Sequence, residues 1–482
     1  MSTFVQVRKN KQAPILEKVL IEDYAAEGKS LARVDGKVIF VEGAVPGDVV
    51  DIQLQKNKAD WAEGFAKNFH SYSANRVQPF CEHFGVCGGC QWQMLPYAQQ
   101  LQYKHKQVVD NLTRIAKVAL PEIAPILGAT PTEGYRNKVE YTFATEKFIP
   151  FEAFRAMKAA GTLPEKSVGA GGFHARGFFE KVVEIDTCHL QEEPTNLMRK
   201  AVAQFAVDNE MPFYNIKQHV GWLRNMFVRN TTQGEWMVNL ILGYEDKEKR
   251  EALLNLLLQQ FPQITTLLYT INTKRNDSMQ DLVPQVYFGN GYITEKLEDF
   301  QFKISPKSFF QTNSKQAESL YQVTRSFAEL TGKEVVYDLY CGTGSIGIFC
   351  SQEAKKIIGV EVVADAIEDA KENARINNLT QTAFFAGDVI DICDDAFFDT
   401  HGKPDVIITD PPRAGMHDKL VKKLLEIQAP LIVYVSCNPA TQARDLSLLG
   451  EKYTVTKIQP VDMFPHTLHI ENVVQLKRTD LL

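Results

Sequence analysis

The carboxyl-terminal third of the chain carries the pattern that most narrows the choice of fold. After Phe300, apolar strand-like runs alternate with helical runs, and VVYDLYCGTGSIGIF ends a strand at Asp338 and opens a helix through a glycine turn, Gly342-Thr-Gly344-Ser-Ile-Gly347. Strands that alternate with helices predict a parallel, doubly wound sheet. The glycines let the backbone approach a ligand at the carboxyl end of a strand, where such sheets bind ligands. The glycine pattern alone is a weak signal, because dinucleotide sites share it.

Three acidic residues follow at the ends of the next expected strands. They are Glu361 in KIIGVE, Asp388 in FFAGDV and Asp410 in IITDPP. An acid at the position of Glu361 can accept hydrogen bonds from both hydroxyls of a ribose. Helix capping or a turn explains any one of these acids but not the ordered series. The series resembles the class I S-adenosylmethionine-dependent methyltransferases, which implies a Rossmann-like α/β domain that binds S-adenosylmethionine.

The motif that contains the third acid bears on the kind of methyl transfer. Many enzymes that methylate exocyclic amines carry Asp-Pro-Pro followed by an aromatic residue, but here Arg413 follows Asp410-Pro-Pro412. Arginine does not replace a ring that stacks on a base, so amine methylation loses support. One strand later, YVSCNP places Cys437 at the end of an apolar run. An isolated strand cysteine is usually a small buried hydrophobe, but the place of Cys437 at the ligand-binding edge favours a catalytic role.

Methylation of a pyrimidine carbon needs such a thiol. C5 of uracil is a poor nucleophile, and a thiolate that adds to C6 moves electron density onto C5. The C5 proton must afterwards leave to a base. The tail MFPHTLHIENVVQL offers His466, His469 and Glu471 as candidates. For Glu471 the alternative is an ordinary charge at a strand end.

Four motifs together resemble the RNA uracil-5-methyltransferase family. They stand in family order: Ser308-Phe-Phe-Gln311-Thr-Asn313, Asp410-Pro-Pro-Arg413-Ala-Gly415, Ser436-Cys437-Asn438-Pro439 and His466-Thr-Leu-His469-Ile-Glu471. The resemblance implies that Cys437 is the nucleophile and that Glu471 is the base. It also implies a cofactor site lined by Gln311, Tyr340, Ser345, Glu361, Asp388 and Asp410.

Three of the eight cysteines lie within ten residues, CEHFGVCGGC, as Cys81, Cys87 and Cys90. In a chain of the reducing cytoplasm, such a cluster indicates metal binding or catalysis rather than disulfides. We expect Cys188 to be the fourth ligand, because the other cysteines belong to the carboxyl-terminal domain. Zinc and an iron–sulfur cluster both accept four thiolates, and unpaired thiols are a further alternative.

Members of the resembled family that act on large-subunit ribosomal RNA carry this cysteine set, which implies a [4Fe-4S] cluster. Because cysteines supply all four ligands, the resemblance implies a structural or RNA-positioning cluster rather than a radical enzyme.

The rest of the chain divides into two regions. From about Pro14 to Phe69, short apolar–polar alternations broken by glycine predict a small all-β barrel, and the segment resembles the RNA-binding TRAM domain. Mixed strands and helices then predict an α+β domain, with a surface insertion at Glu152–Gly172. We therefore expect a multi-domain protein: residues 1–69 as an OB-like TRAM barrel, 70–300 as a central α+β domain with the cysteine cluster, and 301–482 as the methyltransferase domain.

The net charge of −6 and the pI of about 6.0 give no global basic footprint for RNA. Local patches must supply such binding. A helical segment at residues 97–117 carries five basic side chains, Lys104, His105, Lys106, Arg114 and Lys117, although a solvated helix face explains them equally well. Gly134-Tyr-Arg136-Asn137-Lys138 and Gly221-Trp-Leu-Arg224 place further basic residues near strand starts, where they meet either phosphates or salt-bridge partners.

These patterns favour a cytoplasmic enzyme, since the N-terminal stretch lacks a secretory signal and no apolar run is long enough for a membrane. The expected reaction is methylation of C5 of a uridine in RNA, most simply in 23S ribosomal RNA. The alternatives are methylation of transfer RNA, methylation of an amine or ribose hydroxyl, and a non-catalytic RNA-binding or assembly factor.

Overall fold

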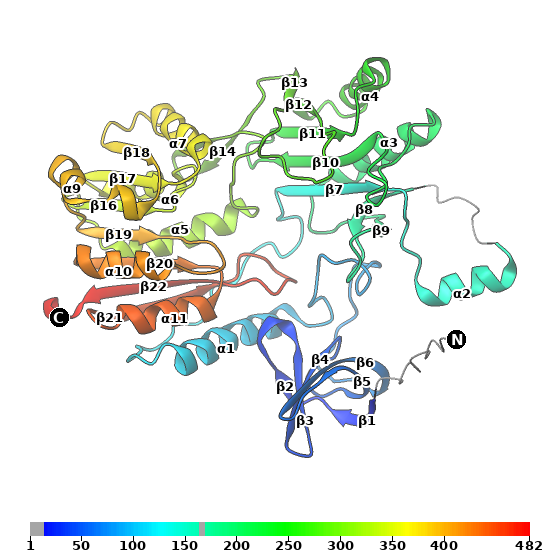
Figure 1. The fold of residues 1–482 in the computed structure, drawn as a ribbon, viewed down its shortest axis with the longest axis horizontal. Helices are drawn as coiled ribbons and strands as arrows, with labels where there is room; N and C mark the ends of the chain where they lie inside the picture. Colours follow the sequence, from blue (N-terminus) through cyan, green and yellow to red (C-terminus); the bar gives the residue numbers. More distant parts are fainter. Residues whose placement is uncertain (1–13, 163–168) are drawn as a thin grey trace, which may run out of the picture. The chain divides into compact units, whose positions relative to one another are not determined.

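The computed structural model describes residues 14–162 and 169–482, which form two compact units (Figure 1). The first unit contains the chain up to Phe80 together with residues 91–103, and the second contains residues 81–90 and 104–482. The cysteine-rich loop therefore belongs to a different unit from the segments on either side of it. The first 13 residues of the expected barrel and residues 163–168 of the expected insertion lie outside the described residues. The domain boundaries at residues 69 and 300 stay a prediction.

The first unit is built on a six-stranded sheet in the order β1-β5-β6-β4-β3-β2. Its strands are β1 (Ile15–Leu20), β2 (Asp23–Tyr24), β3 (Ser30–Val34), β4 (Lys37–Glu42), β5 (Val49–Asn57) and β6 (Trp61–Ser71), and a 3-10 turn spans Ala26–Gly28. β4 and β6 run parallel, and the other pairs are antiparallel. Alternate residues such as Ile39, Val41 and Ile52 are buried and form the core. The prediction that this region is rich in β-structure is confirmed.

The second unit begins with a seven-stranded central sheet in the order β13-β12-β11-β10-β7-β8-β9. Its strands are β7 (Lys138–Ala144), β8 (Ala170–His174), β9 (Val182–Glu184), β10 (Leu223–Asn230), β11 (Trp236–Leu242), β12 (Ile264–Ile271) and β13 (Gln285–Phe288). β11 and β12 run parallel, and the other pairs are antiparallel. Helices α3 (Thr195–Asp208) and α4 (Lys247–Gln260) share an apolar core with one face of this sheet.

The opposite face of the central sheet is polar. Side chains alternate between faces along a strand, so Lys138, Glu140 and Thr142 of β7 share the face that α3 and α4 do not cover. Asn225 of β10 lies directly opposite Thr142 in the ladder. Helix α2 (Phe151–Ala160) leaves the sheet between β7 and β8, and none of its ten described residues is buried.

The carboxyl-terminal sheet has the order β18-β17-β16-β19-β20-β22-β21 (Figure 1). Its strands are β16 (Val335–Leu339), β17 (Lys356–Glu361), β18 (Thr382–Ala386), β19 (Val406–Thr409), β20 (Leu431–Ser436), β21 (Tyr453–Val461) and β22 (Glu471–Arg478). β16 to β20 are parallel, and β22 runs antiparallel to both β20 and β21. The Rossmann-like prediction is therefore confirmed. The sheet also places the carboxyl ends of five strands and the first residue of β22 along one edge.

Helices cover both faces of this sheet. The core on one face takes in α5 (Ser314–Ala328), α6 (Ser345–Cys350), α7 (Ala364–Ile376) and the hairpin of β14 (Ile293–Leu297) and β15 (Phe300–Ile304). The core on the other face takes in α8 (Val389–Ile392), α9 (Asp395–His401), α10 (Asp418–Ile427), α11 (Pro439–Leu449) and part of α1 (Tyr97–Ile115). Short 3-10 turns span Ser351–Glu353 and Thr479–Leu481. No helix in the described part of the chain is long and apolar enough to cross a membrane.

Candidate active site

The glycine turn lies between β16 and α6, as the sequence predicts. Gly342 and Gly344 have φ angles of +54° and +77°, in the left-handed region that favours glycine. A Cβ atom on Gly344 would come within 2.9 Å of the Phe384 ring, whereas nothing lies within 4 Å of the position of a Cβ on Gly342. Gly344 thus permits close packing under the turn, and Gly342 leaves open space above the turn for a ligand.

The predicted acids surround this turn. Glu361 accepts hydrogen bonds from the backbone N–H groups of Gly342 (3.3 Å) and Val363 (2.9 Å). Burial raises the pKa of Tyr340, and the charges of Asp388 and Glu361 add to that rise, so these three predicted cofactor residues lie near one another. Asp388 also caps α8 by accepting from the backbone N–H of Ile390 at 2.9 Å.

Ser345 and Gln311 stand in different surroundings. The Ser345 hydroxyl is hydrogen bonded to Tyr321 Oη at 3.0 Å. Gln311 is nearly buried in the loop before α5, and its carbonyl oxygen accepts a hydrogen bond from Asn137 Nδ2 at 3.1 Å. In the same loop, Asn313 caps α5 and donates to the carbonyl of Met463 at 2.9 Å. This contact ties the Gln311 loop to the segment that leads into β22.

Cys437 and Glu471 lie at the same edge of the sheet. Cys437 follows β20 and Glu471 opens β22, and in the ladder between these strands Ser436 pairs with Asn472. Because the two strands are antiparallel, the start of one lies beside the end of the other. Asp410 follows the neighbouring strand β19. The structure therefore brings the predicted nucleophile, the predicted base and the third acid together.

Burial raises the pKa of all three groups, and the negative charges of neighbouring carboxylates add to the rise for Cys437 and Glu471. Burial raises the pKa of the Cys437 thiol to about 11, and the charges of Glu471 and Asp410 add to the rise. Burial and then the Asp410 charge raise the pKa of Glu471 well above its ordinary value. Burial also raises the pKa of Asp410 to about 7. The surroundings therefore favour the neutral thiol of Cys437 and the neutral carboxyl group of Glu471 over their ionised forms.

Arg413 opposes the rise in the pKa of Cys437 and Glu471. The sequence motif alone did not indicate this role. The positive charge of Arg413 lowers the pKa of both Cys437 and Glu471. Its Nη2 atom is 3.1 Å from His469 Nδ1, and its carbonyl oxygen accepts a hydrogen bond from Asn438 Nδ2 at 3.1 Å. The loop after β19 is thus tied to the turn after β20, with the guanidinium beside the thiol.

The cysteine-rich loop is attached to the end of the β8–β9 hairpin. Gly88 N–H donates to the carbonyl of His174 at 3.3 Å, and Arg176 N–H donates to the carbonyl of Val86 at 3.0 Å. The backbone N–H of Asp186 donates to His83 Nε2 at 2.7 Å. These bonds bring the loop 81–90 beside the segment that carries Cys188, about 100 residues later in the chain.

The thiols of this loop lie close to Cys188. Burial raises the pKa of Cys87, and the charges of Cys188 and Cys81 contribute to the rise. Cys90 and Cys188 both influence the buried hydroxyl of Tyr135. Among the described residues, no group of three or more His, Cys, Asp or Glu side chains is arranged to hold a metal ion.

Backbone amides face the cysteine sulfurs. Gly89 N–H donates to Cys87 Sγ at 3.4 Å. Burial raises the pKa of Cys81 and Cys188, and backbone N–H groups oppose the rise: those of His83 and Phe84 for Cys81, and those of Leu190 and Gln191 for Cys188. Such donors stabilise thiolate over thiol.

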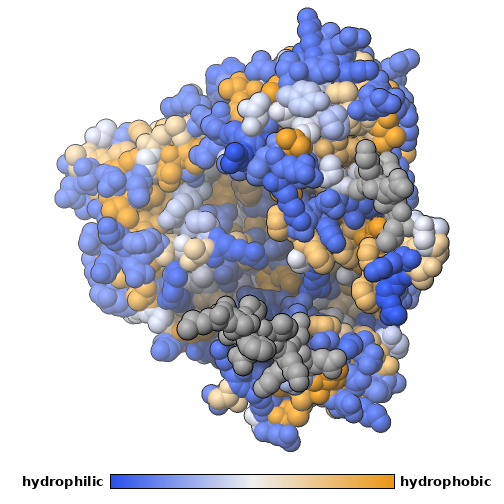
Figure 2. Space-filling model, turned by 45° about the vertical axis from the view of Figure 1, so that its right-hand side comes forward, coloured by the Kyte–Doolittle hydropathy of each residue, from blue (hydrophilic) through white to orange (hydrophobic). Residues whose placement is uncertain are grey.

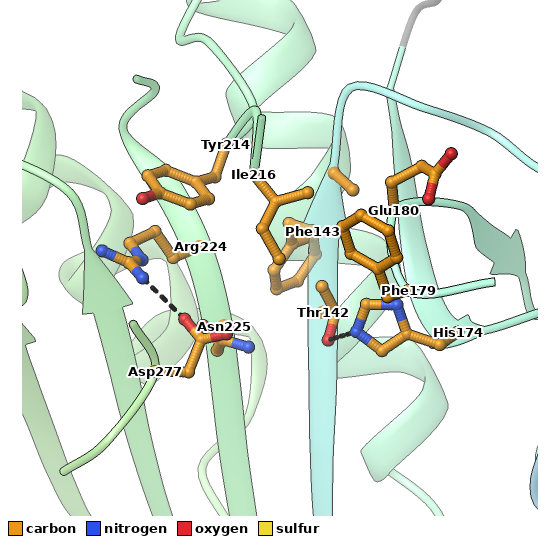
Figure 3. A pocket seen from close by; sticks show the side chains of 11 residues that line it. Thr142, Phe143, His174, Phe179, Glu180, Tyr214, Ile216, Arg224, Asn225 and Asp277 are labelled. Carbon is orange, nitrogen blue, oxygen red and sulfur yellow. Dashed lines mark hydrogen bonds and ion pairs between the residues drawn. The ribbon is translucent and has the colours of Figure 1, made fainter. Parts of the chain in front are cut away.

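Two of the basic residues considered as candidates for phosphate contacts, Arg224 and Lys104, are buried. Arg224 donates to the carbonyl oxygens of Asn272, Lys274 and Asn276 and forms an ion pair with Asp277 at 2.6 Å, beneath the Tyr214 ring (Figure 3). Lys104 is fully buried and pairs with Asp462 at 2.6 Å. The salt-bridge alternative is therefore the correct one for Arg224, and Lys104 is not part of an exposed basic face. Lys106 and Arg114 share the carboxylate of Asp110.

Comparison with known proteins agrees with this geometry. Residues 17–66 match the TRAM domain, residues 322–430 match the methyltransferase small domain, and residues 395–479 match the tRNA (uracil-5-)-methyltransferase family. An uncharacterized RNA methyltransferase of Bacteroides thetaiotaomicron is 50% identical over 456 residues, which cover 94% of this chain and 99% of the relative. One of Porphyromonas gingivalis is 46% identical over 462 residues, 95% of this chain and 99% of the relative.

A solved structure is similar over nearly the whole chain. The Pyrococcus abyssi tRNA (uracil-54, C5)-methyltransferase, in complex with S-adenosyl-L-homocysteine, matches with a TM-score of 0.73 and 27% identity. The match covers 95% of this chain and 100% of the other. The fold and the site thus define a class I S-adenosylmethionine-dependent RNA methyltransferase with a TRAM domain. Within that class, the chain belongs to the RNA uracil-5-methyltransferase family.

Proposed function

We propose that Cys437 is the nucleophile and Glu471 the base in the methylation of uracil C5, and that the target uridine lies in 23S ribosomal RNA. The observation that carries the assignment of roles is the pairing of β20 with β22, which puts the thiol and the carboxyl group at one sheet edge beside Asp410. A reaction at C5 needs a nucleophile for C6 and a base for the C5 proton within reach of one base.

The proposed reaction proceeds in three steps at this edge. Before these steps, the Cys437 thiol and the Glu471 carboxyl group lose their protons to solvent. The Cys437 thiolate bonds to C6, and the electron pair of the C5=C6 bond moves onto C5. Bound S-adenosylmethionine would supply the methyl group: the bond from the methyl group to the sulfonium sulfur would break as the bond to C5 forms, and S-adenosylhomocysteine would leave. The Glu471 carboxylate then takes the C5 proton, the C5=C6 bond re-forms, and Cys437 leaves as a thiolate. Because the thiol is half-buried in the protein, the uridine must leave its stack to reach it.

The turn between β16 and α6 fits S-adenosylmethionine. We propose that Glu361 binds the ribose hydroxyls, that Tyr340 and Asp388 lie against the nucleoside, and that Gln311, Ser345 and Asp410 complete the site. The open space above Gly342 and the acids grouped around it support this assignment. Asp388 caps α8 with one oxygen, which leaves its second oxygen for a ligand.

The cysteine loop fits a thiolate-bound cluster. We propose that Cys81, Cys87, Cys90 and Cys188 hold a [4Fe-4S] cluster with a structural or RNA-positioning role. Backbone N–H groups aimed at the sulfurs are the outer contacts that stabilise ligating thiolates. The metal is tested by measuring iron, acid-labile sulfide and zinc in anaerobically purified protein. Iron with sulfide would support the cluster, and zinc without sulfide would contradict it. Thiols must stay reduced to hold the cluster, which agrees with the cytoplasm as the proposed place of action.

Transfer RNA is the second candidate substrate, and one observation favours it. The Pyrococcus abyssi tRNA enzyme matches over 95% of this chain, so the match must include part of the N-terminal sheet. That architecture therefore does not separate enzymes of ribosomal RNA from enzymes of transfer RNA. The cysteine cluster, through the family resemblance, is what favours 23S ribosomal RNA.

Tritium release tests the reaction and the substrate together. RNA labelled with 5-tritiated uridine is isolated from cells that lack the enzyme, separated into ribosomal and transfer RNA, and incubated with protein and S-adenosylmethionine. We expect release from 23S ribosomal RNA by the wild-type protein and none by Cys437→Ala. Release from transfer RNA alone would establish the second candidate. Methyl incorporation without tritium release would mean transfer to an amine or a hydroxyl group, and binding without either signal would indicate an assembly factor.

A further inference from the structure

Four exposed phenylalanines lie on the central part of the second unit, away from the catalytic edge. Phe151 and Phe154 belong to α2 and are 72% and 41% exposed, and Phe178 and Phe179 follow β8 and are 42% and 65% exposed. We call these two pairs the phenylalanine surface. Large apolar side chains are usually exposed singly, so two exposed pairs in one stretch of the chain indicate a binding surface.

Helix α2 buries none of its side chains against the described parts of the chain. Phe151, Phe154 and Met157 repeat at the spacing that puts them on one side of the helix, yet none of its ten described residues is buried. Figure 1 shows the helix standing away from the central sheet. A helix of this length is marginal in water by itself, and most helical stability in proteins comes from packing of an apolar face. A partner that covers this face would supply that packing.

Cations accompany the rings. The Arg155 guanidinium carbon lies 5.8 Å from the centre of the Phe151 ring, and Lys181 Nζ lies 5.3 Å from that of Phe178. The described residues of this stretch, 147–162 and 169–181, contain five Lys or Arg and two Glu, a net charge of +3, in a chain whose net charge is −6. The carboxylate of Glu180 is paired with Lys217 at 3.1 Å. The surface therefore attracts anions, which argues against an apolar or basic protein partner.

Phe178 contacts a further ring near the start of α2, and Phe179 lines a hollow of mixed polar and apolar side chains. The Phe178 ring lies 5.6 Å from Phe148, three residues before α2 begins. The Phe179 ring lies above His174 and close to Thr142, and all three side chains line the same hollow on the open face of the sheet (Figure 3). Hydrophilic residues predominate over the face shown in Figure 2, with hydrophobic residues scattered among them.

We propose that the phenylalanine surface binds unpaired nucleotides of the RNA substrate, outside the site of methylation. Rings with neighbouring cations are the combination that binds single-stranded nucleic acid, because every base has a face that stacks and every nucleotide has a phosphate. A base stacked on Phe179 meets His174 and Thr142 as hydrogen-bonding groups. Arg155, Lys158 and Lys181 meet the phosphates. The inference rests on the RNA substrate of the enzyme but not on the roles of Cys437 and Glu471.

Binding of a fluorescein-labelled 12-nucleotide oligouridylate, followed by anisotropy, tests the proposal. The variants are Phe151→Ala/Phe154→Ala and Phe178→Ala/Phe179→Ala, whose side chains are exposed and whose loss leaves the core intact. Loss of one stacking contact weakens binding about fivefold or more, so we expect each pair to weaken it at least about tenfold. Phe288→Ala is the matched control, because this ring is 47% exposed on β13 of the same sheet. S-adenosylmethionine affinity checks that each variant is folded.

Crosslinking gives a second readout that does not depend on variants. With 4-thiouridine in the oligouridylate, we expect crosslinks in the tryptic peptides 148–155 and 177–181 of the wild-type protein. Unchanged affinity in both double variants, crosslinks confined to other peptides, or equal competition by double-stranded RNA would each overturn the proposal. A change from dimer to monomer in the Phe151→Ala/Phe154→Ala variant, at unchanged RNA affinity, would instead assign the surface to a protein contact. Tritium release by wild-type protein stays a separate measure of the catalytic proposal.

Discussion

Cysteine occurs in two contrasting surroundings in this molecule. Cys437 stands at a sheet edge with two carboxyl groups beside it, and burial and those acids raise its pKa to about 11. Burial also raises the pKa of Cys81, Cys87 and Cys188, that of Cys87 likewise to about 11. At Cys437 the carboxyl groups of Glu471 and Asp410 add to the effect of burial. In the loops, backbone N–H groups that face the sulfurs offset part of that effect.

Under the proposed roles, neighbouring groups rather than the residue type separate the nucleophile from the ligands. A thiolate with a raised pKa is the stronger nucleophile, although it is the slower leaving group. A thiolate that binds iron must persist, so donors around it are an advantage. Arg413 belongs to the first site and moderates the effect of the acids there.

The largest effect is expected at Glu471. Glu471→Gln leaves the addition of Cys437 and the methyl transfer in place but removes the group that takes the C5 proton. We expect tritium release to fall by about 10²–10⁴-fold and a covalent protein–RNA complex to survive denaturing electrophoresis. The double variant Glu471→Gln/Cys437→Ala must form no such complex. Normal release in the single variant would show that another group is the base.

Cys188→Ser tests the other half of the comparison. Loss of one ligand should release the iron. It should also uncouple the loop 81–90 from Cys188, and the loss of this cross-link over roughly 100 residues should lower the free energy of unfolding by about 4 kcal/mol. Iron content and chemical denaturation measure the two effects. Cys437→Ser is the matched variant, which should keep its iron and its stability but lose tritium release. Equal iron content in both variants would contradict the ligand assignment.

Much of the catalytic edge was predictable because its determinants are local. Each strand ends in or is followed by a residue of recognisable type: Glu361 ends β17, and Asp388, Asp410 and Cys437 follow β18, β19 and β20. The β-rich N-terminal region and the parallel sheet follow from the periodicity of apolar residues in the same way. The prediction that Glu471 lies beside Cys437 also depended on the family resemblance. Glu471 reaches this edge only because β22 runs antiparallel to β20 and begins where β20 ends.

The places of the charged residues were not predictable in this way. Lys104 can be buried because it pairs with the carboxylate of Asp462, 358 residues later in the chain. Arg224 can be buried because a turn at residues 272–277 presents carbonyl oxygens to its guanidinium. Burial of a charge depends on partners far away in the sequence. The packing of α1 on the carboxyl-terminal sheet also depends on residues far away in the sequence. The charges along that helix therefore do not predict it.

The pH dependence distinguishes a resting thiol from a resting thiolate. The pKa of Cys437 is raised to about 11 and that of Glu471 is raised as well, so the reactive ionised forms of both become more abundant as pH rises. We expect kcat/KM for tritium release to increase about tenfold per pH unit, or more steeply, from about pH 6.5 to 8.5. Stopped assays over that range, with protein stability checked at each pH, provide the measurement. A flat profile would mean that Cys437 is already ionised in the free enzyme.

Arg413→Met gives the smallest and most specific change. Its guanidinium lowers the pKa of both Cys437 and Glu471, and its removal should therefore move the rising limb of the profile to higher pH, by about one unit or less. Measurement of kcat at saturating RNA separates this shift from weaker RNA binding. Arg375→Met is the matched control, since Arg375 is exposed on α7 and pairs with Glu372. If the pH profile does not shift while KM alone rises, Arg413 serves RNA binding rather than the ionisation of the thiol. No positive charge of Arg413 would then offset the effect of the acids on the pKa of Cys437.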